Sequence, residues 1–158
     1  MSKQARSVHL GDVENLAGGP ARLADRSDLG DQYREVVRPA GDDLFVIGSD
    51  ITNVFYGAAS FPGARLVTGR GPSGADHALM ASNSLGWLVD RVDTVVIGSG
   101  DGDFALFARA CREAGLRVVV VARRSAVGSA LLANADAFIP FPETGAGEAA
   151  AAALAVAA

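Results

Sequence analysis

The sequence predicts a three-layer α/β/α fold, in which a central parallel sheet of five to six strands is covered by helices on both faces. Short apolar segments alternate with segments of helical periodicity along the chain. This alternation favours right-handed crossover connections, which make neighbouring strands parallel and place helices over both faces. With 158 residues and an apolar fraction of 49%, the chain can bury one hydrophobic core.

The predicted strands are short apolar runs that end at glycine, proline or polar residues. The run at 94–97 is the clearest, and the run at 118–121 is made only of valine, which favours a strand buried on both faces. The other predicted strands begin near Val8 and lie at 44–47, 65–68 and 137–139.

The predicted helices carry apolar residues on one face. In the segment 28–38 these residues are Leu29, Tyr33, Val36 and Val37. Further helices are predicted at 53–59, 75–89, 103–114 and 126–134, and Gly115 is expected to cap the fourth of these five. The Ala-rich segment from residue 145 is also expected to be helical.

Composition excludes several classes of protein. The single cysteine, Cys111, rules out an intrachain disulfide, and no apolar run reaches the length of about 18 residues that a membrane span requires. The N-terminus has no apolar signal stretch, so we expect a cytoplasmic protein without membrane contact. The net charge of −4 argues against broad electrostatic attraction to nucleic acid but leaves room for a local basic rim.

Acidic residues recur where the predicted strands end. Asp12 ends the first strand, Asp76 follows the third after a loop, and Asp101 and Asp103 follow the fourth. Asp50 follows the second strand and is a weaker candidate, because no motif surrounds it. Ligands of open parallel sheets bind beyond the carboxyl ends of the strands, so we expect these carboxylates to converge there.

Converging carboxylates would repel one another unless a cation lay between them. Mg²⁺ or Mn²⁺ fits such a site, because both prefer carboxylate and water oxygens. Each aspartate also has a purely structural interpretation. Asp76 lies three residues after Ser73, as in a capping box, while Asp101 or Asp103 could cap a helix and Asp12 could belong to a turn with Asn15.

Two nucleotide-binding motifs are excluded. The sequence Gly98-Ser99-Gly100 begins like a dinucleotide fingerprint, but Asp103 stands where the third glycine would be. No Walker lysine is present either. Positive charge for phosphate contacts is expected from arginines near the same strand ends, namely Arg70, Arg123 and Arg124.

Three segments resemble the motif blocks of NYN domains, which belong to the PIN-like superfamily of metal-dependent ribonucleases. The segments are Asp12-Val13-Glu14-Asn15-Leu16, Arg70-Gly71-Pro72-Ser73-Gly74-Ala75-Asp76-His77-Ala78-Leu79 and Val96-Ile97-Gly98-Ser99-Gly100-Asp101-Gly102-Asp103-Phe104. The resemblance covers roughly residues 7–141, which we take as the domain, and leaves 142–158 as an Ala-rich helix or tail.

The resemblance implies that Asp12, Asp76, Asp101 and Asp103 bind Mg²⁺ or Mn²⁺ and hydrolyse RNA phosphodiester bonds. It also implies that Asn15 and Ser99 orient these acids or contact phosphate, and a homodimer is compatible with it. Two alternatives remain open. One is a non-catalytic module that binds RNA or protein, and the other is a TOPRIM-like metal enzyme, for which Glu14 would be the catalytic glutamate.

Overall fold

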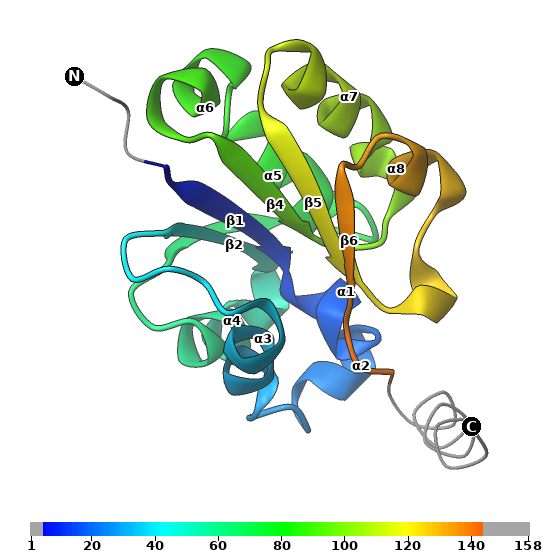
Figure 1. The fold of residues 1–158 in the computed structure, drawn as a ribbon. Coiled ribbons are helices and arrows are strands. Elements are labelled where there is room, and N and C mark those ends of the chain that lie inside the picture. Colours follow the sequence, from blue (N-terminus) through cyan, green and yellow to red (C-terminus); the bar gives the residue numbers. More distant parts are fainter. Residues whose placement is uncertain (1–4, 144–158) are drawn as a thin grey trace.

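The computed structural model describes residues 5–143 and contains one parallel sheet of six strands in the order β3-β2-β1-β4-β5-β6 (Figure 1). The strands are β1 (Ser7–Asp12), β2 (Leu44–Asp50), β3 (Arg65–Gly69), β4 (Thr94–Gly98), β5 (Arg117–Ala122) and β6 (Ala137–Pro140). The predicted sheet is therefore confirmed. The helix expected from residue 145 lies outside the described residues.

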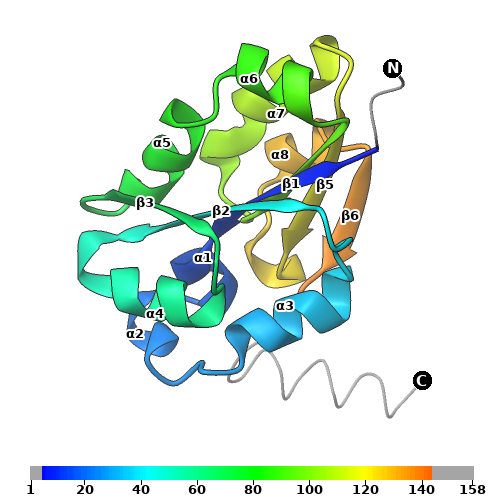
Figure 2. The same cartoon turned by 90° about the vertical axis from the view of Figure 1, so that its left-hand side faces the viewer.

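Helices cover both faces of the sheet, as expected (Figure 2). One layer contains α1 (Val13–Ala17), α2 (Pro20–Leu23), α3 (Leu29–Val37) and α4 (Val54–Ser60). The other contains α5 (Gly74–Ala81), α6 (Leu85–Arg91), α7 (Ala105–Glu113) and α8 (Ser129–Ala133). Short 3₁₀ turns, η1 (Ile51–Asn53), η2 (Gly102–Phe104) and η3 (Arg124–Ala126), follow β2, β4 and β5. No helix in the described part of the chain is long and apolar enough to span a bilayer.

The core consists of two apolar layers, one on each face of the sheet. Successive side chains of a strand alternate between the faces, so Val95 and Ile97 pack in one layer and Val96 in the other. In β5, Val118 and Val120 likewise share a layer opposite to their neighbours. The run of valines is explained by this burial on both sides.

The prediction of a single helix at 75–89 is wrong, because the chain turns between α5 and α6. The Ser82 hydroxyl donates to the carbonyl of Ala78 (2.7 Å), and the Asn83 amide donates to that of Leu79 (2.7 Å). Ser84 then caps α6 by accepting a hydrogen bond from the backbone N–H of Trp87 (3.3 Å). These short polar side chains compete with helical hydrogen bonds and end one helix before starting the next.

Two short helices, α1 and α2, occupy a region where no helix was predicted from the sequence. The first is capped by Asp12, and the second begins with Pro20, a residue that fits the first helical position. The predicted cap at Gly115 is confirmed, because this glycine adopts the left-handed conformation (φ 89°) just after α7.

Candidate metal centre

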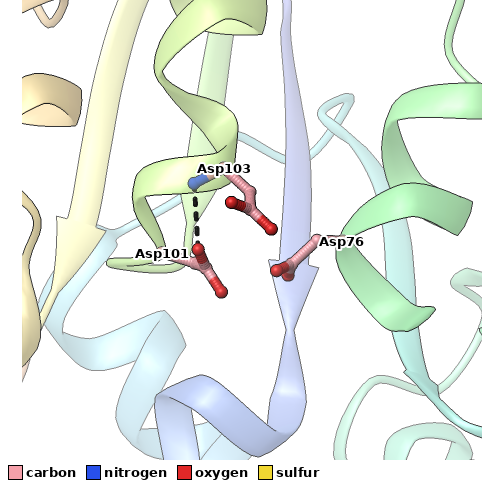
Figure 3. Close-up of side chains that lie close together, drawn as sticks. All are labelled: Asp76, Asp101 and Asp103. Carbon is pink, nitrogen blue, oxygen red and sulfur yellow. Dashed lines mark hydrogen bonds between the residues drawn. The ribbon is translucent and has the colours of Figure 1, made fainter. Parts of the chain in front are cut away.

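Three aspartates meet at the carboxyl end of the sheet. One carboxylate oxygen from each of Asp76, Asp101 and Asp103 lies within 4.8 Å of the other two (Figure 3). Asp76 is in the first turn of α5, Asp101 follows β4, and Asp103 is in η2. The strand order reverses between β1 and β4, which is where open parallel sheets bind their ligands.

The turn after β4 is held by hydrogen bonds that fix its two aspartates. The carboxylate of Asp101 accepts from the backbone N–H of Asp103 (2.9 Å), and the Ser99 hydroxyl accepts from that of Asp101 (3.2 Å). The side-chain oxygen of Asn15 accepts from the backbone N–H of Gly100 (3.0 Å). The family resemblance implied that Asn15 and Ser99 orient the acids or contact phosphate. In the structure Asn15 holds this turn from α1, and Ser99 holds it from within.

The turn also requires close backbone packing at Gly100. A Cβ atom placed there would lie 2.5 Å from the carbonyl oxygen of Ala126 in η3. A Cβ at Gly102 would meet nothing within 4 Å. The two glycines therefore differ, and only the first is needed for η3 to pack against the turn.

Asp12 lies at the end of β1, beside Asp76. It is 7% exposed, and its carboxylate accepts from the backbone N–H of Asn15 (3.2 Å) as the cap of α1. Burial raises its pKa, although contacts with Asp76 and with backbone N–H groups oppose this effect. The structural role of Asp12 and its place beside the other acids thus coexist.

Asp76 is the most unusual carboxylate of the site. Its side chain is 1% exposed, and its Oδ1 has no hydrogen-bond partner among the described residues. Burial, followed by the neighbouring Asp12 and Asp101, raises its pKa to about 10. The predicted capping box is not formed, because the Ser73 side chain makes no capping hydrogen bond.

These residues fit a divalent cation. Within residues 5–143, no Lys or Arg forms an ion pair with any of the four aspartates. A buried, unpartnered carboxylate oxygen is costly unless a proton or a cation satisfies it. Hard cations such as Mg²⁺ and Mn²⁺ take carboxylate oxygens and water, which is the donor set that the site offers.

A cavity of about 550 Å³ adjoins the acids. It is lined by Asp12, Glu14, Asn15, Gly19, Pro20, Asp50, Thr52, Asn53, Gly71, Pro72, Ala75 and Asp101. We call it the acidic cleft. Its volume falls in the range of small-ligand sites, which is roughly 300–1,000 Å³.

Glu14 and Asp50 shape the far wall of the acidic cleft. The Glu14 carboxylate accepts from the backbone N–H of Asp50 and from the Asn53 side chain. Asp50 accepts from Thr52 and from the backbone N–H of Gly71 (3.1 Å). Thr52 and Asn53 also line the cleft and were not predicted from the sequence, although their position after the second strand could have indicated them.

The three arginines proposed from the sequence do not line the acidic cleft. Arg70 is exposed near Asp50. Arg123 donates to the backbone carbonyl of Asn15 (3.3 Å), and the guanidinium of Arg124 lies over the Phe138 ring at 5.7 Å from its centroid. The described lining of the cleft is thus without cationic side chains.

Comparisons with known proteins agree with this geometry. The profile of the NYN domain matches residues 51–142, more than half of the chain, and includes Asp76, Asp101 and Asp103 but not Asp12. No curated protein matches the sequence significantly. The crystal structure of a protein of unknown function from Vibrio parahaemolyticus RIMD 2210633 is similar in fold, with a TM-score of 0.63 and 19% identity over 90% of this chain and 96% of that chain. The chain belongs to the NYN domain family, a PIN-like family of the nuclease type.

Proposed function

We propose that the protein is a metal-dependent ribonuclease whose domain spans residues 7–141. The observation that carries the proposal is the meeting of three aspartate oxygens within 4.8 Å, together with the burial of Asp76 and its unpartnered Oδ1. NYN and PIN-like nucleases generally use divalent metals. Mg²⁺ or Mn²⁺ bound here would supply charge stabilisation at the scissile phosphate and a bound water of lowered pKa.

The aspartates would hold the cation in different ways. Asp76 is fixed by its burial and offers an oxygen that nothing else in the described chain satisfies. Asp101 accepts a hydrogen bond from the backbone N–H of Asp103 with one oxygen, and its carboxylate also lies against that of Asp76. Asp103 is exposed, and Asp12 lies beside Asp76 with one of its oxygens engaged in capping α1.

The acidic cleft is the place proposed for the nucleotide next to the scissile bond. Its walls offer side-chain hydrogen-bonding groups from Asn15, Thr52 and Asn53 and a backbone surface at Gly71 and Pro72. Glu14 fixes the β2–α4 connection that carries two of these groups. The residues needed to orient a substrate and those needed to hold a cation are therefore adjacent.

A second candidate is a binding module without catalysis. It is favoured by the lack of cationic side chains in the described cleft lining and by the net charge of −4. Such a module would bind RNA or a protein without cleaving it.

The test is cleavage of labelled single-stranded and structured RNA with Mn²⁺, Mg²⁺ or EDTA. Asp101→Asn is the informative variant, because the asparagine oxygen can still accept from the backbone N–H of residue 103. Asp90→Asn, at an exposed position on α6, is the matched control. We expect metal-dependent cleavage by the wild type and by Asp90→Asn, and its loss in Asp101→Asn. No cleavage by folded wild type across these substrates would favour the binding module.

A further inference from the structure

A second cavity lies at the opposite end of β2 from the acidic cleft. It has a volume of about 690 Å³. It is lined by Arg34, Arg38, Pro39, Ala40, Gly41, Asp43, Leu44, Phe45, Phe61, Pro62, Gly63, Ala64 and Arg65. We call it the arginine pocket. In a protein of net charge −4 it groups three arginines with one acid.

The charges of the arginine pocket are not neutralised within it. The carboxylate of Asp43 accepts hydrogen bonds from the side chain of His9 (3.0 Å) and from the backbone N–H groups of Ser7 and Ala40. One N–H of the Arg65 guanidinium donates to the carbonyl of Ser82 (3.3 Å) at the end of α5. Arg34 and Arg38 form no ion pair with any residue that the structure describes.

Arg38 is held in an unfavourable backbone conformation. It is the only described non-glycine residue with positive φ (54°), and it caps the end of α3 just before Pro39. Glycine or asparagine would adopt this conformation more readily than arginine. Such strain recurs at ligand-binding positions.

Arg34 is fixed to the end of α4. Its guanidinium lies 5.6 Å from the centroid of the Phe61 ring and donates to the carbonyl of Ser60 (3.4 Å). Gly30, one turn earlier on α3, allows this approach, because a Cβ there would lie 1.7 Å from the same carbonyl oxygen. A guanidinium has five N–H donors, so most of those of Arg34 remain for a ligand.

The helix α4 joins the two cavities. Asn53, just before the helix, lines the acidic cleft, and Phe61, just after it, lines the arginine pocket. The seven residues of α4 span about 10 Å. The exposed face of this helix carries two aromatic side chains, Phe55 (83% exposed) and Tyr56 (42% exposed).

We propose that a single-stranded RNA substrate lies along α4, with a backbone phosphate in the arginine pocket and bases stacked on Phe55 and Tyr56, before it enters the acidic cleft. This inference rests on the proposed ribonuclease function. The acidic cleft cannot attract a polyanion by its own charge, whereas the arginine pocket can. Exposed aromatic rings beside cationic side chains are the usual means of holding single strands without sequence preference.

The first experiment measures binding of a fluorescent single-stranded RNA by anisotropy in EDTA, where metal-dependent cleavage cannot occur. Phe55→Ala should weaken binding about five- to 150-fold, the factor that corresponds to losing one stacked base. Leu106→Ala is the control, because Leu106 is 78% exposed but lies on α7 in the other helical layer. Its affinity should match that of the wild type.

The second experiment addresses the phosphate. Arg38→Asn keeps a residue that tolerates the left-handed conformation but removes the charge, while Arg38→Lys keeps the charge. Arg38→Asn should lower the slope of log affinity against log salt by about 0.7 for one lost contact with a single strand, and Arg38→Lys should retain the slope. Competition by inorganic phosphate or a mononucleotide as effective as by RNA would instead assign the pocket to a free small anion and overturn the RNA path.

Cleavage with Mn²⁺ separates failure of this inference from failure of the proposed function. If wild type, Phe55→Ala and Arg38→Asn bind and cleave RNA equally, the path along α4 is wrong while the ribonuclease stands, and the aromatic face belongs to another contact, such as a protein. If the variants lose RNA binding but the wild type never cleaves, the path holds and the catalytic proposal fails. Absence of RNA binding by folded wild type in EDTA overturns the path.

Discussion

At the scale of single residues, the aspartates of the centre differ in how much of their side chain the fold itself uses. Asp101 caps η2, as its structural interpretation predicted, and Asp12 caps the helix α1 where only a turn was expected, so both have a structural role beside their place in the cluster. Asp76 caps nothing, and one of its oxygens is unpartnered. The fold alone therefore gives no reason for burying a carboxylate at this position.

His9 belongs to a separate buried network. Its Nε2–H donates to the Asp43 carboxylate (3.0 Å), which only accepts, so Nδ1 accepts from the Tyr33 hydroxyl (2.7 Å). The imidazole stacks on the Phe45 ring at 4.6 Å between centroids. Burial lowers the pKa of His9, although the hydrogen bond and the charge of Asp43 oppose this effect. These contacts give His9 a structural role in the core.

This network predicts a loss of stability in mild acid. The folded state keeps His9 neutral, whereas the unfolded chain binds a proton below the ordinary histidine pKa of 6.5. The free energy of unfolding should therefore fall as pH drops below 6.5, by at most about 1.4 kcal/mol per pH unit for one proton. Urea unfolding between pH 7.5 and 5 measures this slope, which His9→Gln should flatten.

His77→Gln is the matched control, because His77 is the only other histidine and is exposed. Its slope should equal that of the wild type. Asp43 acts in a different window: burial would raise its pKa, but the hydrogen bonds from His9 and two backbone N–H groups lower it. Its contribution is present above the ordinary aspartate pKa and is lost only in stronger acid. A steep slope near pH 6 that survives in His9→Gln would contradict the assignment to His9.

At the scale of elements, the turn between β4 and η2 shows that glycines close together in sequence have different functions. The turn contains three glycines, Gly98, Gly100 and Gly102. None of them has positive φ. Gly98 and Gly100 instead pack closely against neighbouring backbone, while Gly102 faces open space.

This difference in packing predicts that an alanine substitution destabilises the protein at Gly100 but has little effect at Gly102. Gly100→Ala should lower the free energy of unfolding by about 1–3 kcal/mol, because its Cβ would displace the backbone of η3. It should also reduce metal-dependent cleavage, since the shift moves Asp101. Gly102→Ala should change stability by less than about 0.5 kcal/mol. Urea unfolding and RNA cleavage of both variants check this, and equal effects of the two substitutions would refute the packing argument.

At the scale of the whole molecule, the centre joins elements that are distant in sequence. Asp76 approaches from α5, which follows the edge strand β3, and Asp101 follows β4 in the middle of the sheet. In the absence of a cation, burial and the neighbouring acids keep the pKa of Asp76 near 10. A bound cation would replace this unfavourable arrangement with attraction between α5 and the β4 turn.

We therefore predict that Mn²⁺ or Mg²⁺ raises the melting temperature relative to EDTA. At about 100 times the dissociation constant the stabilisation is about 2.7 kcal/mol, which corresponds to a shift of at least about 5 °C for a protein of this size. Asp76→Asn should lose this shift, and in EDTA it should melt close to the wild type, because a pKa near 10 leaves the Asp76 carboxyl uncharged at neutral pH, like the amide. Differential scanning calorimetry measures both effects. Asp90→Asn should keep the full shift, and a shift retained by Asp76→Asn would place the cation elsewhere.

The sequence alone determined the layers of the fold, the parallel sheet and most element positions, because burial on both faces imposes valine-rich strands and helices need one apolar face. It also indicated the acids of the centre, since the carboxyl ends of parallel strands share one edge. It missed the break at Ser82–Ser84, where side-chain hydrogen bonds outweigh periodicity.

Only the tertiary structure decided which groups meet. Three features depend on how elements distant in the chain pack together. They are the hydrogen bond from Arg123 to Asn15, the unpartnered oxygen of Asp76, and the arginine pocket formed by α3 and the end of α4. The apolar periodicity of a single segment contains no information about the distances between such elements. The physical reason is that periodicity reports which face of an element is buried, whereas the partner against which it is buried is set by the packing of the whole chain.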